Sequence, residues 1–143
     1  MTEKLVPGSS TSQSSARGRV VIAEDDQTMR KMLVNAFRRD AYDVIEAKNG
    51  AELLHVIGAL RIEQHDGISI DLVVSDLRMP LLSGLDVLAH VRRESATMPF
   101  ILITAFGDDA THTLAAELGA SAVFDKPFDV GALRRRAREL LAG

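Results

Sequence analysis

None of the 143 residues of the chain is cysteine or tryptophan, and only one is tyrosine. Without cysteine the protein can form neither disulfides nor a thiolate metal site, and this absence is typical of a reducing compartment. No apolar run approaches the roughly 18 residues of a membrane-spanning helix. Leu5 and Val6 are followed at once by Pro7 and Gly8, which argues against a signal peptide. We therefore expect a cytoplasmic protein with no membrane partner.

The formal net charge of −3 provides no long-range attraction for nucleic acid. One cluster of basic residues lies near the C-terminus and comprises Arg134, Arg135, Arg136 and Arg138. It is either a solvated helix face, with an Arg135–Glu139 ion pair at i, i+4, or a surface for a partner or a homodimer. No aromatic residues accompany these arginines, so we predict no direct nucleic acid binding.

The first 18 residues differ in composition from the rest of the chain. They are rich in serine and glycine and have no apolar periodicity, so they cannot bury enough apolar surface to offset the entropy of ordering. We predict a flexible N-terminal tail over residues 1–18 and a single domain over residues 19–143. A domain of that length can bury a proper core without disulfides or metals.

From Arg19 onward, short β-branched runs alternate with longer stretches of helical periodicity. Apolar strands separated by helices favour a parallel sheet that is covered on both faces. With right-handed crossovers, five βα units predict a doubly wound α/β domain. The predicted strands occupy residues 20–23, 43–47, 72–74, 100–103 and 122–124.

Local signals mark several helix ends. Ser83, followed three residues later by Asp86, predicts an N-cap for the third helix. Asp108 or Asp109 can cap the fourth helix, and Gly119 is suited to end it. The i, i+3, i+4 spacing of apolar residues predicts the buried face of the first helix. That face comprises Met29, Met32, Leu33, Ala36 and Phe37.

Polar side chains follow four of the five predicted strands. Ligands of an open parallel α/β sheet bind at the carboxyl ends of its strands. We therefore expect these side chains to lie close together at one edge. They are Glu24 and Asp25 after the first strand, Asp76 after the third, Thr104 after the fourth and Lys126 after the fifth.

This set of side chains suits phosphoryl chemistry. Clustered carboxylates repel one another unless a cation joins them, and hard carboxylate oxygens without histidine or cysteine suit Mg²⁺. Asp76 can then attack a phosphoryl donor as a carboxylate nucleophile. Lys126 supplies a positive charge and Thr104 a hydroxyl donor, and such positioning and charge neutralisation provide most of the catalysis in phosphoryl transfer.

Several segments resemble the receiver domains of two-component response regulators, in the right order and strand context. The resemblance extends from about Arg19 to Leu141 and also includes Gly84. It implies a flavodoxin-like (βα)5 fold with strand order 2-1-3-4-5. The segments that carry it are residues 21–26, 71–80, 103–105 and 125–128.

The resemblance also implies roles for individual residues. Asp76 would accept a phosphoryl group from a sensor histidine kinase or a phosphotransfer protein. Thr104 and Lys126 would contact that group, and the Lys126–Pro127 bond would be cis. The implied magnesium ligands are the carboxylates of Glu24, Asp25 and Asp76 and the backbone carbonyl of Arg78.

Phosphorylation would then change the face made by the fourth helix, the fifth strand and the fifth helix, which would contact a downstream protein target. The sequence departs from the family pattern at Val123, three residues before Lys126. Many family members carry tyrosine or phenylalanine there, and valine cannot make the same large inward rotation. A coupled threonine–aromatic switch is therefore not expected, and Phe124 should point to the other side of the strand.

Three other functions are compatible with parts of this pattern. An aspartyl phosphatase often carries a second aspartate two residues after its nucleophile, but this position is Arg78, so we expect a phosphoacceptor with slow self-dephosphorylation rather than an enzyme that turns over. A phosphorylation-independent interaction module would usually lack one of the five site residues. The sequence could also be a receiver excised from a larger regulator or a hybrid kinase.

Overall fold

The computed structural model describes residues 17–62, 69–105 and 107–142. Of the predicted tail, residues 1–16 therefore lie outside the described part. Arg17 and Gly18 are joined to the domain, because the Arg17 N–H donates to the Ala41 carbonyl over 3.0 Å and the Asp43 N–H donates to the Gly18 carbonyl over 2.9 Å.

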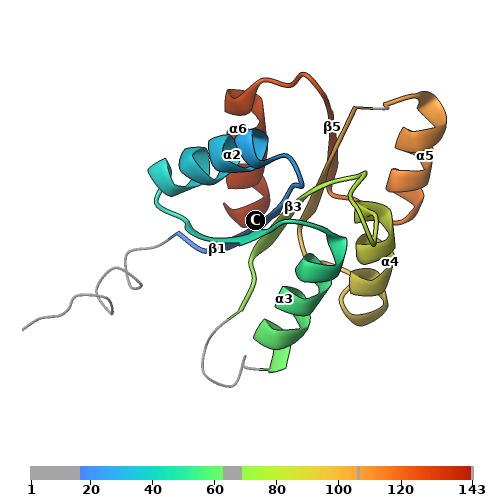
Figure 1. Cartoon of the computed structure of the whole chain (residues 1–143), viewed down its shortest axis with the longest axis horizontal. Coiled ribbons are helices and arrows are strands. Elements are labelled where there is room, and N and C mark those ends of the chain that lie inside the picture. Colours follow the sequence, from blue (N-terminus) through green and yellow to red (C-terminus); the bar gives the residue numbers. More distant parts are fainter. Residues whose placement is uncertain (1–16, 63–68, 106, 143) are drawn as a thin grey trace, which may run out of the picture.

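Five strands and five helices alternate along the described chain (Figure 1). The strands form one parallel sheet with the order β2-β1-β3-β4-β5, which confirms the predicted topology. The strands are β1 (Arg19–Ala23), β2 (Asp43–Ala47), β3 (Leu72–Asp76), β4 (Phe100–Thr104) and β5 (Ala122–Asp125). The helices are α2 (Gln27–Arg39), α3 (Gly50–Ile62), α4 (Gly84–Glu94), α5 (Asp109–Glu117) and α6 (Val130–Ala142).

The sheet separates two hydrophobic cores. Helices α2 and α6 cover one face, and α3, α4 and α5 lie on the other (Figure 1). Successive strand residues alternate between the faces, so Val20 and Ile22 belong to the first core while Val21 belongs to the second. At β5, Phe124 packs against the first core and Val123 against the second, as the alternation predicted.

The predicted helix ends are confirmed. Ser83 and Asp86 form a capping box at the start of α4. The Asp108 carboxylate accepts a hydrogen bond from the Thr111 N–H and caps α5. Gly119, with a φ of +94°, ends α5 in the left-handed conformation that favours glycine.

One helix face differs from the prediction. The buried stripe of α2 includes Arg30, Leu33 and Phe37, and it leaves Met32 39% exposed. Apolar spacing correctly predicted Leu33, Ala36 and Phe37. It could not identify Arg30, because Arg30 is buried through polar contacts rather than through apolar character. Its contacts are described below with the site.

The C-terminal arginines also differ from the prediction. Glu139 pairs with Arg136 at i, i+3 over 3.2 Å instead of with Arg135. Arg134 is directed to Asp40 at the end of α2. None of the helices in the described part of the chain combines the length and the apolar character needed to cross a bilayer.

Candidate functional site

Strand pairing brings three acidic side chains to one edge of the sheet. In the parallel pairing of β1 with β3, Ala23 lies opposite Ser75, so the residues that follow them, Glu24 and Asp76, are neighbours. Asp25 is next in the chain. One carboxylate oxygen from each of these three acids lies within 4.8 Å of the others. The convergence predicted from sequence is therefore present.

Lys126 completes this cluster from the end of β5. Its Nζ lies 3.2 Å from Asp76 Oδ2 and 3.3 Å from Glu24 Oε1. Glu24 is 1% exposed and Asp76 is buried, whereas Asp25 is exposed to solvent. The cluster thus has two buried carboxylates, one ammonium group between them and one carboxylate at the surface.

The charges of the cluster perturb one another. Burial raises the pKa of Glu24 to about 7, and the Asp76 carboxylate adds to this, while the Asp26 N–H and Lys126 act in the opposite direction. Burial opposes the charge of Lys126, but Asp76 and Glu24 outweigh it and raise the pKa of the ammonium group. The buried negative charge is therefore only partly balanced by the protein itself.

Arg30 fixes the end of β1, and the sequence analysis did not identify it. Its guanidinium is buried and donates to the Glu24 carbonyl over 2.9 Å and to Glu46 Oε1 over 3.1 Å. It therefore joins α2, β1 and β2 immediately beside the acidic cluster. The one available signal was its position between Met29 and Leu33 on an otherwise apolar helix face.

Thr104 and Lys126 are held together by their backbones. The Lys126 N–H donates to the Thr104 carbonyl over 2.7 Å, and β4–β5 pairing places Thr104 opposite Asp125. Thr104 is buried at the end of β4. The Lys126–Pro127 bond is cis, as the resemblance to receiver domains implied.

Backbone hydrogen bonds hold the loop after Asp76 against the end of β4 and close it on itself. The Leu77 N–H donates to the Ile103 carbonyl over 2.7 Å, and the Gly84 N–H donates to the Leu77 carbonyl over 2.8 Å. A Cβ atom on Gly84 would lie 2.5 Å from the Asp76 carbonyl oxygen, so this position requires glycine. Arg78 is exposed in this loop, and metal coordination by its carbonyl stays a prediction.

The acidic cluster fits a magnesium ion. It offers three carboxylates and no nitrogen or sulfur ligand, which is the donor set that Mg²⁺ prefers. Because Asp25 faces solvent, the site is open and leaves room for water or for phosphate oxygens. Glu24, Asp25 and Asp76 are therefore the residues that would hold the ion.

A second contact beside the cluster was also missed by the sequence analysis. His112 Nε2 on α5 lies 2.8 Å from Asp125 Oδ1, next to Lys126. A Cβ atom on Gly107 would lie 1.6 Å from the same oxygen, so the chain before α5 presses against this carboxylate. His112 was predicted to be a surface residue, and it is indeed partly exposed.

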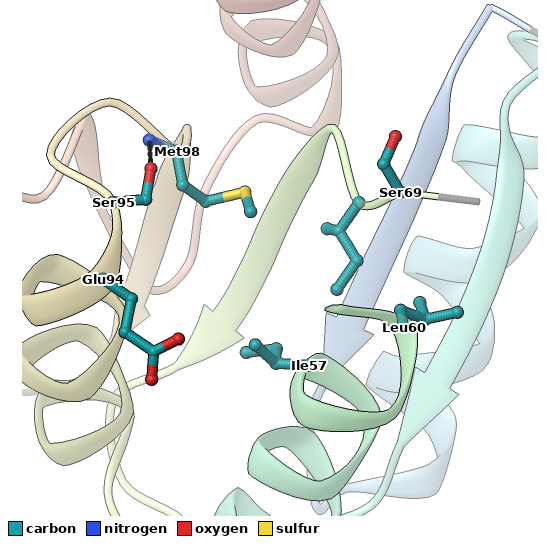
Figure 2. A pocket seen from close by; sticks show the side chains of 7 residues that line it. Ile57, Leu60, Ser69, Glu94, Ser95 and Met98 are labelled. Atoms are coloured by element: carbon teal, nitrogen blue, oxygen red, sulfur yellow. Dashed lines mark hydrogen bonds between the residues drawn. The ribbon is translucent and has the colours of Figure 1, made fainter. Parts of the chain in front are cut away.

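A cavity of about 250 Å³ lies at the opposite edge of the sheet (Figure 2). Ile57 and Leu60 line it from α3, Met98 lies before β4, and Glu94 comes from the end of α4. Glu24, Asp25, Asp76 and Lys126 lie at the carboxyl ends of the strands, away from this cavity. The cavity therefore takes no part in the acidic cluster.

Known proteins similar to this chain agree with the geometry of the site. A family model described as the response regulator receiver domain matches residues 20–138. The aerobic respiration control protein ArcA of Escherichia coli K12 is 33% identical over 123 residues, which are 86% of this chain and 48% of ArcA. A probable transcriptional regulatory protein of Picosynechococcus is 30% identical over 127 residues, which are 89% of this chain and 50% of that protein. The chain spans about half the length of these curated relatives.

Solved structures have the same fold. The non-phosphorylated receiver domain of HemR from Leptospira biflexa is 26% identical, with a TM-score of 0.73, and the match covers 88% of this chain and 95% of that one. A response regulator receiver domain protein from Clostridium thermocellum is also 26% identical, with a TM-score of 0.73, and the match covers 87% of this chain and 94% of that one.

Proposed function

Because this chain belongs to the response regulator receiver domain family, we propose that it is a phosphoacceptor switch in which Asp76 accepts a phosphoryl group from a phosphohistidine. The donor is a sensor histidine kinase or a phosphotransfer protein. The observation that carries the proposal is the cluster of Glu24, Asp25 and Asp76 within 4.8 Å, with Lys126 3.2 Å from Asp76. We propose that the protein acts in the cytoplasm, which its lack of cysteine supports.

In the proposed transfer, a carboxylate oxygen of Asp76 forms the new O–P bond while the N–P bond of the donor breaks, and the electron pair leaves with the imidazole nitrogen. Lys126 holds positive charge beside the entering phosphoryl group, and the hydroxyl of Thr104 donates to one of its oxygens. Glu24, Asp25, Asp76 and the Arg78 carbonyl would hold Mg²⁺, which would supply charge neutralisation when bound. The protein contributes positioning and electrostatics, so we propose a self-phosphorylating and slowly self-dephosphorylating acceptor rather than an enzyme that turns over.

The proposed output is a change in the surface formed by α5, β5 and α6, because Thr104 and Lys126 precede the segments that lead into α5 and α6. Phosphorylation adds about −1.5 to −2 charges at neutral pH, which is enough to shift a two-state loop. The recipient is either a separate downstream protein or another domain of a longer regulator or hybrid kinase. Val123 requires that this change proceed without the rotation of an aromatic side chain at its position.

The direct test is intact-mass measurement after incubation with acetyl phosphate and Mg²⁺. We expect the gain of one phosphoryl group, its absence in Asp76→Asn, and its absence when a chelator removes the metal. Full labelling in chelator would contradict the magnesium site. No labelling of a folded protein with any donor would favour a phosphorylation-independent interaction module instead.

A further inference from the structure

Leu81, in the loop between β3 and α4, is exceptional in two respects. Its side chain is 78% exposed, more than that of any other large hydrophobic residue in the described chain. Its φ of +77° is in the left-handed region, which is unfavourable for a residue with a branched side chain. Asparagine or glycine would relieve the strain and also remove the exposed apolar surface, so neither backbone conformation nor burial favours leucine here.

The neighbouring residues of this loop serve the fold. Met79 and Leu82 pack against the core on the α3 and α4 side of the sheet. The Leu82 N–H donates to the Pro80 carbonyl over 2.9 Å, and this contact closes the backbone around Leu81. The loop is thus anchored on both sides, and Leu81 is exposed to solvent together with Arg78 and Pro80.

We propose that Leu81 is an apolar anchor for the phosphohistidine-bearing protein that donates to Asp76. This inference rests on the proposed function of Asp76. The occupant is one protein surface, which must place its phosphorylated histidine on Asp76 and cover Leu81 with an apolar recess. A small phosphodonor has no such surface and gains nothing from the contact.

The short chain between Leu81 and Gly84 keeps Leu81 within reach of a protein donor that engages Asp76. Leu81 is three residues from Gly84, where an added Cβ atom would lie 2.5 Å from the Asp76 carbonyl oxygen. Three residues span at most about 11 Å. A standard interface buries about 800 Å² on each partner, which corresponds to a disc of roughly 16 Å radius. A footprint of this size centred on Asp76 extends far enough to include Leu81, and covering an exposed leucine strengthens the complex.

The test compares a protein donor with a small one. The protein donor is a purified, autophosphorylated histidine kinase chosen by profiling several kinases against the unaltered chain, and the small donor is acetyl phosphate. Leu81→Asn keeps a residue that tolerates positive φ, and Leu81→Met keeps the apolar surface. Leu114→Asn is the matched control, because Leu114 is an exposed leucine on α5.

We expect Leu81→Asn to reduce kcat/KM for transfer from the kinase at least tenfold, since tenfold corresponds to burial of most of one leucine side chain. Leu81→Met and Leu114→Asn should stay close to the unaltered chain, and all variants should be labelled by acetyl phosphate at equal rates. Equal transfer from the kinase to Leu81→Asn would overturn the anchor. Equal slowing with both donors would also overturn it, because the loop would then act on the chemistry. Failure of the unaltered chain with both donors would overturn the proposed function and the anchor with it.

Discussion

Arg134 on α6 donates hydrogen bonds from Nε and Nη2 to the two carboxylate oxygens of Asp40, and the Nε–Oδ2 distance is 2.8 Å. Asp40 directly follows α2, so this bidentate contact joins the two helices on one face of the sheet. Arg138 adds a longer contact of 3.6 Å to the same carboxylate. Sequence analysis assigned these arginines to a solvated or partner-binding face, whereas two of them stabilise the domain itself.

This contact predicts a pH-dependent stability. The Arg134 hydrogen bond lowers the pKa of Asp40 below its ordinary value of 3.8, despite the opposing effect of burial. The charged carboxylate therefore stabilises the fold above about pH 3.8, and the contribution is lost as the pH falls through the lower folded pKa. Asp40→Asn should lower Tm at pH 7, and its Tm should converge with that of the unaltered protein in acid.

Thermal unfolding between pH 2.5 and 7 measures the effect. Glu139→Gln is the control, because Glu139 forms an exposed ion pair with Arg136 on the same helix and such pairs contribute little. A Tm difference for Asp40→Asn that stays constant down to the lowest pH would contradict the role of the charged pair.

The acidic cluster predicts that Mg²⁺ raises Tm, because a ligand that binds only the folded state stabilises it by mass action. Asp25→Asn removes one exposed carboxylate ligand, so we expect it to weaken Mg²⁺ binding about tenfold or more. Calorimetric titration gives the affinity directly. Asp26→Asn is the matched control, since Asp26 is adjacent but caps α2 and asparagine is an equally good N-cap. Equal losses of affinity in both variants would exclude a specific role of Asp25.

Two glycines predict opposite effects of adding a methyl group. Gly84→Ala would place Cβ 2.5 Å from the Asp76 carbonyl, and we expect a loss of about 1–3 kcal/mol in the free energy of unfolding and slower labelling of Asp76. Gly58, within α3, has no atom within 4 Å of such a Cβ. Gly58→Ala should therefore add up to about 1 kcal/mol through helix propensity, with unchanged labelling. Chemical denaturation measures the free energy of unfolding of each variant. An unchanged value for Gly84→Ala would show that the loop can shift at little cost.

Arg92 predicts a loss of stability without a loss of phosphorylation. Its guanidinium donates to the carbonyls of Ser95, Met98 and Gly119 over 2.7–3.1 Å, which joins the end of α4 to the chain after α5. A lysine ammonium lacks the planar, forked donors with which a guanidinium reaches three carbonyls. Arg92→Lys should therefore lower the free energy of unfolding by about 1–3 kcal/mol. Arg93→Lys, at the exposed neighbouring position, should change it little. Slower labelling of Asp76 by acetyl phosphate in Arg92→Lys would contradict a purely structural role.

Sequence patterns were sufficient for the sheet and for the acidic edge. Alternating strand and helix periods predicted the order of elements along the chain. The rule that ligands bind at the carboxyl ends of parallel strands then predicted that Glu24, Asp76 and Lys126 lie close together. Capping chemistry likewise predicted the helix ends at Ser83 and Gly119, because these signals depend on near neighbours in the chain.

The polar contacts between distant segments were decided only by the tertiary structure. Arg30, Arg92 and Arg134 resemble solvated arginines in the sequence, since nothing local shows that a carbonyl or carboxylate from another element will meet them. The exposure of Met32 and Leu81 likewise depends on which helix or loop packs nearby. The sequence determined which residues lie at the carboxyl edge of the sheet, because the order of elements along the chain and the side-chain period are local properties. Only the three-dimensional fold decided which charges are buried and paired, because burial depends on every element that surrounds a side chain.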